Sequence, residues 1–294
     1  MATQLAAKEQ GTSNIQTLPD GSVLVDYGPM QMVIRAYEDG KPLVTLAQEG
    51  AHLALGVLED LAGFLPVIKK KAQGLEVEKE FPDVVRRMVE ATQRMEEPDL
   101  TPLAAVAGAA SDVVADFIFD QGGSKTIVDN GGDIAIRLRG DEVAKVGVKT
   151  DIHSTRPSYM ISIDSTMGIG GVTTSGLGGR SFTKGIASAA TVLSKSAALA
   201  DAAATVIGNF TNVDDPKIRR SLAEGIYPDT DIAGAWVTTE IGRLSPEKIE
   251  EALKHGLSKA YSICERRLIK GALIAVKSRV VWTESLSPLL TKII

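Results

Sequence analysis

The chain has 294 residues, of which 44% are hydrophobic and 23% are charged. These proportions are typical of a globular protein and exclude a wholly disordered one, and the length suits one large domain or two ordinary ones. The net charge of -5 and the aromatic content of 4% argue against a nucleic-acid-binding protein, which would need excess basic residues and side chains that stack on bases.

The N-terminal third predicts a loose arm followed by a small sheet and two helices. Residues 1–14 are expected to form a flexible arm, and alternating apolar and polar residues predict strands over 21–27, 30–37 and, more briefly, 43–46. A helix is predicted over 48–72, with Pro66 ending or kinking it. A second helix is predicted over 81–96.

The next helix, predicted over 103–119, consists largely of small apolar residues. Asp99 or Thr101 is expected to cap it, and Pro102 suits its first turn. Ala107 and Gly108 would allow the backbone of another helix to approach closely. Packing between helices is therefore the simplest interpretation of this segment.

Short segments over 124–129, 134–139, 143–150 and 158–164 predict an antiparallel meander. The first two flank Asn130-Gly131-Gly132-Asp133, where Asn-Gly is a strong turn signal. This segment has two interpretations. It is either a plain hairpin turn or the rim of a pocket in which Asp133 accepts a hydrogen bond from a ligand.

The richest stretch in small residues runs over 163–209, and its first half is a glycine loop. Glycine amides can approach an anion closely, and Arg180 can bind a phosphate in a two-pronged way. The loop lacks the spacing of a Walker A motif or a Rossmann fingerprint. A flexible surface turn is the alternative. The residues that would bind a phosphate are Thr174, Ser175, Gly176, Gly178, Gly179 and Arg180.

The second half of this stretch predicts a helix that carries Asp201 and, four residues later, Thr205. Residues four apart share one face of a helix, and a carboxylate with a hydroxyl one turn away can hold Mg²⁺. The alternative is an isolated acid beside a Thr that bonds to its own backbone.

The C-terminal third predicts a solvated helix over 212–225, a strand over 233–240, a helix over 246–268 and a strand over 272–283. The remaining segment, 285–294, is expected to dock on a partner subunit. The sequence shows neither a signal peptide nor a membrane-spanning run, so a cytoplasmic protein is expected. Cys264 cannot form a disulfide within the chain because it is the single cysteine.

Three ordered motifs in the central third resemble the ApbE superfamily, the flavin transferases once called thiamine-biosynthesis lipoproteins. The segment Ala-Asp-Ala-Ala-Ala-Thr, which carries Asp201 and Thr205, resembles the family's Mg²⁺-binding segment. Thr174-Ser175-Gly176 resembles its Thr-Ser-Gly, and the segment from Asn130 to Asp133 is similar to its strand-entry motif.

The resemblance implies an α+β fold, with small-residue helices packed on antiparallel sheets, in a single domain over 1–294 or in two fused halves. It implies bound FAD or a related nucleotide and Mg²⁺, the latter held by Asp201, Thr205 and a main-chain carbonyl near 106–108. Asn130, Gly131, Gly132 and Asp133 would line the cofactor pocket. A homo-oligomer without nucleic-acid or membrane partners is expected.

The sequence departs from the family in one respect that bears on catalysis. Flavin transferases carry a His segment between the Thr-Ser-Gly and the Asp, whereas this chain has no His between Gly176 and Asp201. His153, in a polar loop, could replace it. The sequence therefore leaves three functions open. The first is flavin or pyrophosphate transfer, and the third is a homo-oligomeric structural protein that binds no ligand. The second is a non-catalytic ligand-binding or assembly module with a role in sulfur metabolism. The second would make Cys264 a persulfide carrier if the thiol is exposed.

Overall fold

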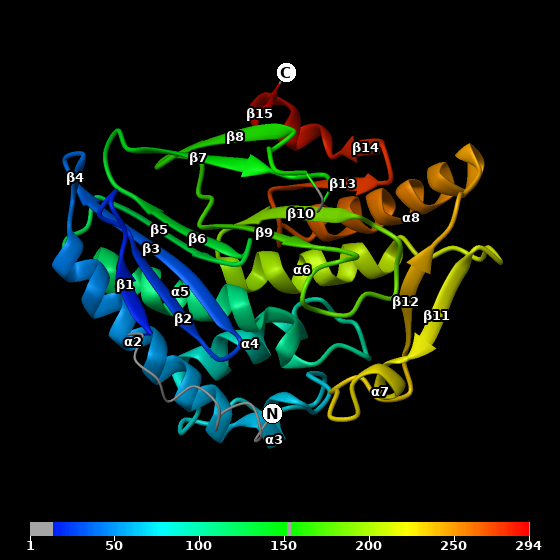
Figure 1. Ribbon diagram of the computed structural model, residues 1–294, viewed down its shortest axis with the longest axis horizontal. Coiled ribbons are helices and arrows are strands. Elements are labelled where there is room, and N and C mark those ends of the chain that lie inside the picture. Colours follow the sequence, from blue (N-terminus) through cyan, green and yellow to red (C-terminus); the bar gives the residue numbers. More distant parts are fainter. Residues whose placement is uncertain (1–13, 152–153, 294) are drawn as a thin grey trace.

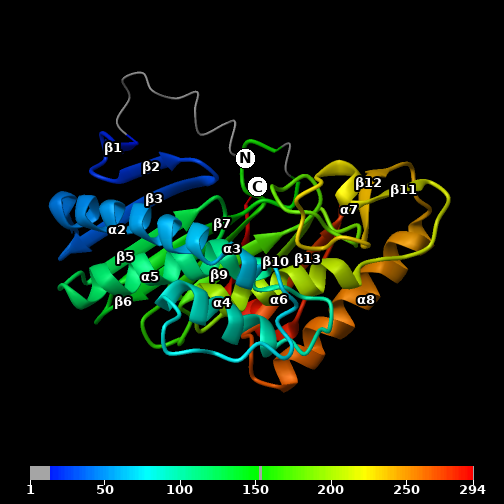
Figure 2. The ribbon, with the colours of Figure 1, turned by 90° about the horizontal axis from the view of Figure 1, so that it is seen from below.

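A computed structural model of the chain describes residues 14–151 and 154–293. His153 and all but the last residue of the arm predicted over 1–14 lie outside the described residues. A large antiparallel sheet carries helices on one face and a small three-stranded sheet on the other (Figures 1 and 2). This arrangement confirms the predicted α+β class with antiparallel sheets.

The large sheet has ten strands, in the order β1-β2-β3-β5-β6-β9-β10-β13-β14, with β4 paired to β3. Its strands are β1 Ile15–Thr17, β2 Val23–Tyr27, β3 Met30–Glu38, β4 Lys41–Pro42, β5 Lys125–Asn130, β6 Ile134–Leu138, β9 Gly171–Ser175, β10 Ala189–Ser194, β13 Gly271–Val276 and β14 Arg279–Trp282. All six residues of β10 are buried because both faces of the sheet are covered there.

Helices cover one face of this sheet and form the larger core with it. They are α2 Val44–Gly63, α3 Leu65–Ile68, α4 Asp83–Gln93, the 3₁₀ helix η1 Pro102–Ala105, α5 Val106–Asp120, α6 Ala197–Phe210 and α8 Pro246–Glu265. The stretch Pro102–Asp120 is long and apolar enough to cross a membrane by length and composition alone. In this fold it is a core helix, packed against α2, α4, α6 and the sheet.

The other face of the large sheet packs on a second sheet, in the order β15-β8-β7. Its strands are β7 Val143–Val148, β8 Tyr159–Asp164 and β15 Leu290–Lys292, and the 3₁₀ helix η2 Glu284–Leu289 leads into β15. The C-terminal segment thus pairs with β8 of its own chain. Whether this tail also contacts a partner subunit stays a prediction.

A hairpin of β11 Ile218–Leu222 and β12 Trp236–Ile241, with the short helix α7 Ala223–Ile226, forms an arm beside the helical layer (Figure 1). The solvated helix predicted over 212–225 is therefore wrong. The segment Ile-Arg-Arg-Ser-Leu has no strand-like alternation, and it forms a strand by pairing with β12, with a register shift between Arg219 and Arg220.

Three further predictions need correction. Residues 43–46 begin α2 rather than a strand, because Pro42 ends the strand pairing at β4. The predicted strand over 272–283 is the hairpin β13–β14. The glycine stretch contains two strands of the large sheet, β9 and β10, so the predicted loop is interrupted after Gly170.

Candidate functional site

Helices α5 and α6 touch backbone to backbone at Gly108, as the small residues there predict. A Cβ on this glycine would lie 2.3 Å from the Ala197 carbonyl oxygen. The Gly108 N–H belongs to the first turn of α5 and so lacks an acceptor within its own helix. It donates instead to the Asp201 carboxylate, at 3.0 Å. The close approach of the helices therefore fixes the position of Asp201.

Thr205 lies one turn beyond Asp201, and its hydroxyl faces the Ala104 carbonyl oxygen at 3.5 Å. Asp201, Thr205 and Ala104 thus gather a carboxylate, a hydroxyl and a main-chain carbonyl. The carbonyl that faces Thr205 is that of Ala104, not one of the carbonyls over 106–108. The reason is that 106–108 already form the first turn of α5, whose amides rather than carbonyls face α6.

A second carboxylate reaches the same place from the β5–β6 turn. The Asn130 N–H donates to the Asp133 carbonyl at 3.2 Å, and Ser111 of α5 donates its hydroxyl to the same oxygen at 2.8 Å. Ser111 thus fastens the turn to α5. The Asp133 carboxylate accepts a hydrogen bond from the Thr174 N–H and interacts electrostatically with Asp201.

Burial raises the pKa of both carboxylates. For Asp201 the pKa rises from 3.8 to about 7, because loss of water outweighs the hydrogen bonds from the Gly108 and Ala107 amides. The pKa of Asp133 is also raised, first by burial and then by the charges of Asp201 and Asp129. Neither carboxylate forms a salt bridge among the described residues. The pair therefore retains protons at a pH at which exposed carboxylates have lost them, and it has no direct cationic partner among the described residues.

Arg180 is the cation that comes nearest to this charge. Its guanidinium donates to the Pro29 carbonyl oxygen at 3.0 Å and lies against Gly131, where a side chain would collide with it. Gly131 has a φ of 70°, a conformation that glycine adopts without strain. The Arg180 charge lowers the pKa of Asp133 and partly offsets the effect of burial.

The remaining predicted cofactor residues divide between the sheet and the surface. Thr174 lies in β9, where its hydroxyl bonds to that of Thr191 at 2.9 Å. Gly176 packs against the backbone at Ser188. Ser175 ends β9, and Gly178 and Gly179 are exposed. The structure thus brings Asp133, the Thr174 amide, Arg180, Asp201 and Thr205 together, and it leaves the other residues at the rim or in the sheet.

Sequence reasoning missed the charged network that supports α6. The Asp112 side chain is fully buried and accepts hydrogen bonds from the Ala197 and Ala198 amides, at 3.0 and 2.8 Å. Arg137 donates to Asp112 at 2.9 Å and to Asp116 at 2.6 Å. One signal was available: acids inside an otherwise apolar helix need buried partners.

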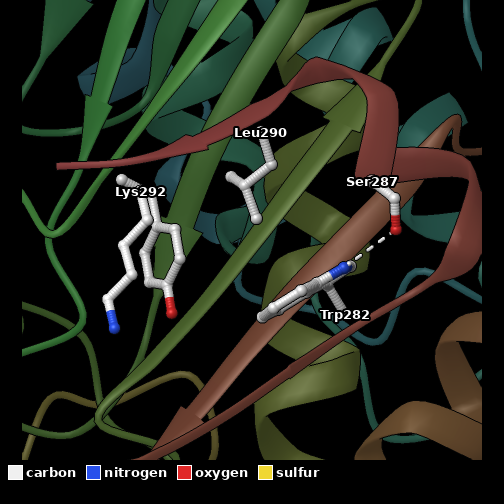
Figure 3. Close-up of a pocket in the computed structure, with 5 residues that line it drawn as sticks. Trp282, Ser287, Leu290 and Lys292 are labelled. Carbon is white, nitrogen blue, oxygen red and sulfur yellow. Dashed lines mark hydrogen bonds between the residues drawn. The ribbon is translucent and has the colours of Figure 1, made fainter.

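The two grooves described for this structure lie away from these carboxylates. One, of about 240 Å³, lies between β8, β14, η2 and β15, where Trp282 donates to Ser287 (Figure 3). Within the part of the chain that the structure describes, no cluster of three or more His, Cys, Asp or Glu side chains could hold a metal ion.

The chain matches the model of the family described as AbpE bacteria over residues 15–282. The protein belongs to this family. It is therefore an ApbE-like protein, as the three sequence motifs implied.

A UPF0280 protein from Methanosarcina barkeri is 32% identical over 208 residues, which cover 70% of this chain and 79% of that protein. Another, from Methanopyrus kandleri, is 37% identical over 143 residues, which cover 48% of this chain and 55% of that one. The apo crystal structure of the Pseudomonas stutzeri flavinyl transferase ApbE superposes with a TM-score of 0.51. At 13% identity, covering 96% of this chain and 100% of that one, the match shows a common fold.

Proposed function

We propose that this ApbE-like protein binds Mg²⁺ together with a flavin or another nucleotide diphosphate where α5, α6 and the β5–β6 turn meet. The observation that carries the proposal is the pair of carboxylates formed by the buried Asp201 and the half-buried Asp133, without a direct cationic partner among the described residues. Buried charge of this kind is costly unless a cation compensates it.

The oxygen atoms at this place fit Mg²⁺, which prefers hard oxygen ligands and binds beside phosphates. The Asp201 carboxylate, the Thr205 hydroxyl and the Ala104 carbonyl would hold the ion. When bound, Mg²⁺ polarises a phosphoryl oxygen and thereby assists attack at a pyrophosphate. Transfer of a flavin or cleavage of a pyrophosphate is the corresponding reaction class.

Arg180 would bind the phosphates of the ligand. Its guanidinium is exposed and is held by one hydrogen bond to the Pro29 carbonyl, so a phosphate can replace that acceptor and gain a two-pronged contact. The Gly131 amide lies next to the guanidinium and would approach the same phosphate. Arg180 thus acts as counter-charge to Asp133 before binding and as phosphate ligand afterwards.

A non-catalytic ligand-binding module is the second candidate, and the histidines favour it. The chain has none between Gly176 and Asp201. His52, on α2, lies within hydrogen-bonding distance of the Gln48 main-chain carbonyl. His255, on α8, lies within hydrogen-bonding distance of the Asn212 main-chain carbonyl. A protein with this site but no general base would hold the ligand without transferring it.

The test is thermal denaturation with FAD, FMN, ADP and ATP, each with Mg²⁺ or with EDTA. A ligand at a hundredfold excess over its dissociation constant adds about 3 kcal/mol to the stability of the native state. We expect FAD or ADP to raise Tm only with Mg²⁺. The effect should be lost in Asp201→Asn and Thr205→Val and kept in Thr205→Ser and in the exposed control Asp141→Asn.

The outcomes separate the two candidates. Mg²⁺-dependent binding accompanied by release of FMN or AMP supports the transferase class. Mg²⁺-dependent binding with an unchanged ligand supports the binding module. No shift with any of the four ligands would refute both.

A further inference from the structure

Helix α8 is buried along one face only. Ala252, Leu253, Gly256, Ala260 and Ile263 face inward, where Gly256 lets the helix rest on Thr211 and Ile274. Figures 1 and 2 show α8 on the outside of the helical layer, with its contacts to α6, β13 and β14 on the inner side. The outer face therefore has no covering element in the described chain.

That outer face forms a shallow groove of about 440 Å³, hereafter the α8 stripe. Its lining comes from α8 alone, over three helical turns: Lys254, Leu257, Ser258, Tyr261, Ser262 and Glu265. Tyr261 is 38% exposed, and Leu257 is half-buried at the floor. The large side chains of Tyr261 and Leu257 project beyond the small side chains of Ser258 and Ser262, so the surface of this helix is uneven.

The charges at the two ends of the α8 stripe are unpaired, unlike the other lysines of α8. Lys248 pairs with Glu251 at 2.9 Å, and Lys259 pairs with Glu97. Lys254 and Glu265 form no ion pair with the residues over 14–151 and 154–293. Glu265 is the last residue of α8, where the helix dipole disfavours a carboxylate. A cation from outside the chain would suit this position.

We propose that the α8 stripe is the contact between two copies of this chain, with their α8 helices antiparallel across a two-fold axis. The stripe is self-complementary in that arrangement. Lys254 meets Glu265 of the other copy, and the reverse pair forms by symmetry. Tyr261 lies over Ser258 of the other copy, and Leu257 lies over Ser262. Each large side chain thus faces a small one, and each charge faces its opposite.

The size of the stripe sets the expected strength of the dimer. Three helical turns cover less surface than the interfaces of about 1,600 Å² that are usual for stable complexes. The dimer should therefore be weak and dependent on concentration, with a dissociation constant in the micromolar range. This inference does not depend on the proposed ligand site, which lies between α5 and α6.

The experiment is sedimentation velocity of the full chain from about 1 to 100 µM, a range that brackets micromolar dimerisation. We expect the wild type to pass from monomer to dimer. Lys254→Glu or Glu265→Lys alone places like charges opposite each other twice, so each should weaken dimerisation at least about tenfold. The double variant K254E/E265K restores both pairs and should dimerise within about threefold of the wild type.

Lys145→Glu, an exposed change on β7 in the other sheet, is the matched control and should dimerise like the wild type. Circular dichroism of every variant checks that α8 is intact. A wild type that is monomeric throughout would overturn the proposal. So would a dimer that the single charge reversals leave unchanged, or a double variant that does not recover.

Discussion

Replacing Asp201 by Asn should stabilise the protein in the absence of metal. Burial raises the pKa of Asp201 from 3.8 to about 7. Between these two pH values the folded state keeps a proton on Asp201 that the unfolded state has released. Each pKa unit corresponds to about 1.4 kcal/mol, and the shift of about three units gives a cost of up to about 4 kcal/mol above pH 7. Asn keeps an oxygen for the Gly108 amide and carries no charge.

The sign of the pH dependence follows from the same shift. Below the unfolded pKa both states are protonated and the cost is absent, whereas the full cost applies above the folded pKa. The wild type should therefore lose stability as the pH rises from about 4 to about 7, and Asp133 should contribute in the same direction because its pKa is also raised. The Asn variant should lose the part of this slope that Asp201 contributes.

Urea denaturation in EDTA at about pH 5 and about pH 8 measures both effects. We expect Asp201→Asn to be about 3–4 kcal/mol more stable than the wild type at the higher pH and about 1–2 kcal/mol more stable at the lower, because about one of the three pKa units is already titrated at pH 5. The exposed Asp141→Asn should match the wild type at both. Mg²⁺ should stabilise the wild type and not the Asn variant. An Asn variant no more stable than the wild type at the higher pH would refute this account of the buried charge.

Three further predictions concern packing, ion pairing and the thiol. Gly108→Ala would push a methyl group into the first turn of α6 and should cost about 3 kcal/mol or more of unfolding free energy, whereas Gly56→Ala, with open space around it, should gain up to about 1 kcal/mol. Arg137→Ala leaves the buried Asp112 without its ion pair and should lower the free energy of unfolding by about 3–5 kcal/mol. Arg219→Ala removes an exposed ion pair and should lower it by less than about 1 kcal/mol. Equal losses of unfolding free energy in urea would contradict this ranking. Burial raises the pKa of Cys264 from 9.0 to about 11, so at about pH 8 iodoacetamide should alkylate the native thiol at least about tenfold more slowly than the unfolded one, and equal rates would show that the thiol is accessible and ionised.

The sequence was most informative where local chemistry decides the structure. Ser245 accepts from the Lys248 amide and Pro246 begins α8, as the cap and the proline predict. The Asn-Gly turn after β5 and the close approach at Gly108 follow in the same way from residue type. The order of the three motifs also led to the family, whose model matches residues 15–282.

It was least informative where partners distant in the sequence decide the structure. Gly170 and Gly171 looked like parts of a ligand loop, yet they let β9 lie directly under Lys195 and Ala197. The roles of Asp112 and Arg137 also depend on segments that meet only in the folded protein. Glycine allows close packing of backbones and also allows a ligand to approach the backbone, so the sequence alone does not distinguish these two roles.

The bond from Gly108 to Asp201 joins residues 93 positions apart, and the contact of Thr205 with Ala104 joins residues 101 positions apart. A calcium loop of the EF-hand type collects its ligands within about 12 residues and can begin to form around the ion. Here the chain must bring the start of α5 against α6 before the oxygen atoms that would bind the ion come together. Closing such a long loop has an entropic cost, and the ion cannot offset this cost before the loop has closed. We therefore expect the site to form late in folding. An ion bound there would stabilise the completed fold and would not initiate its formation.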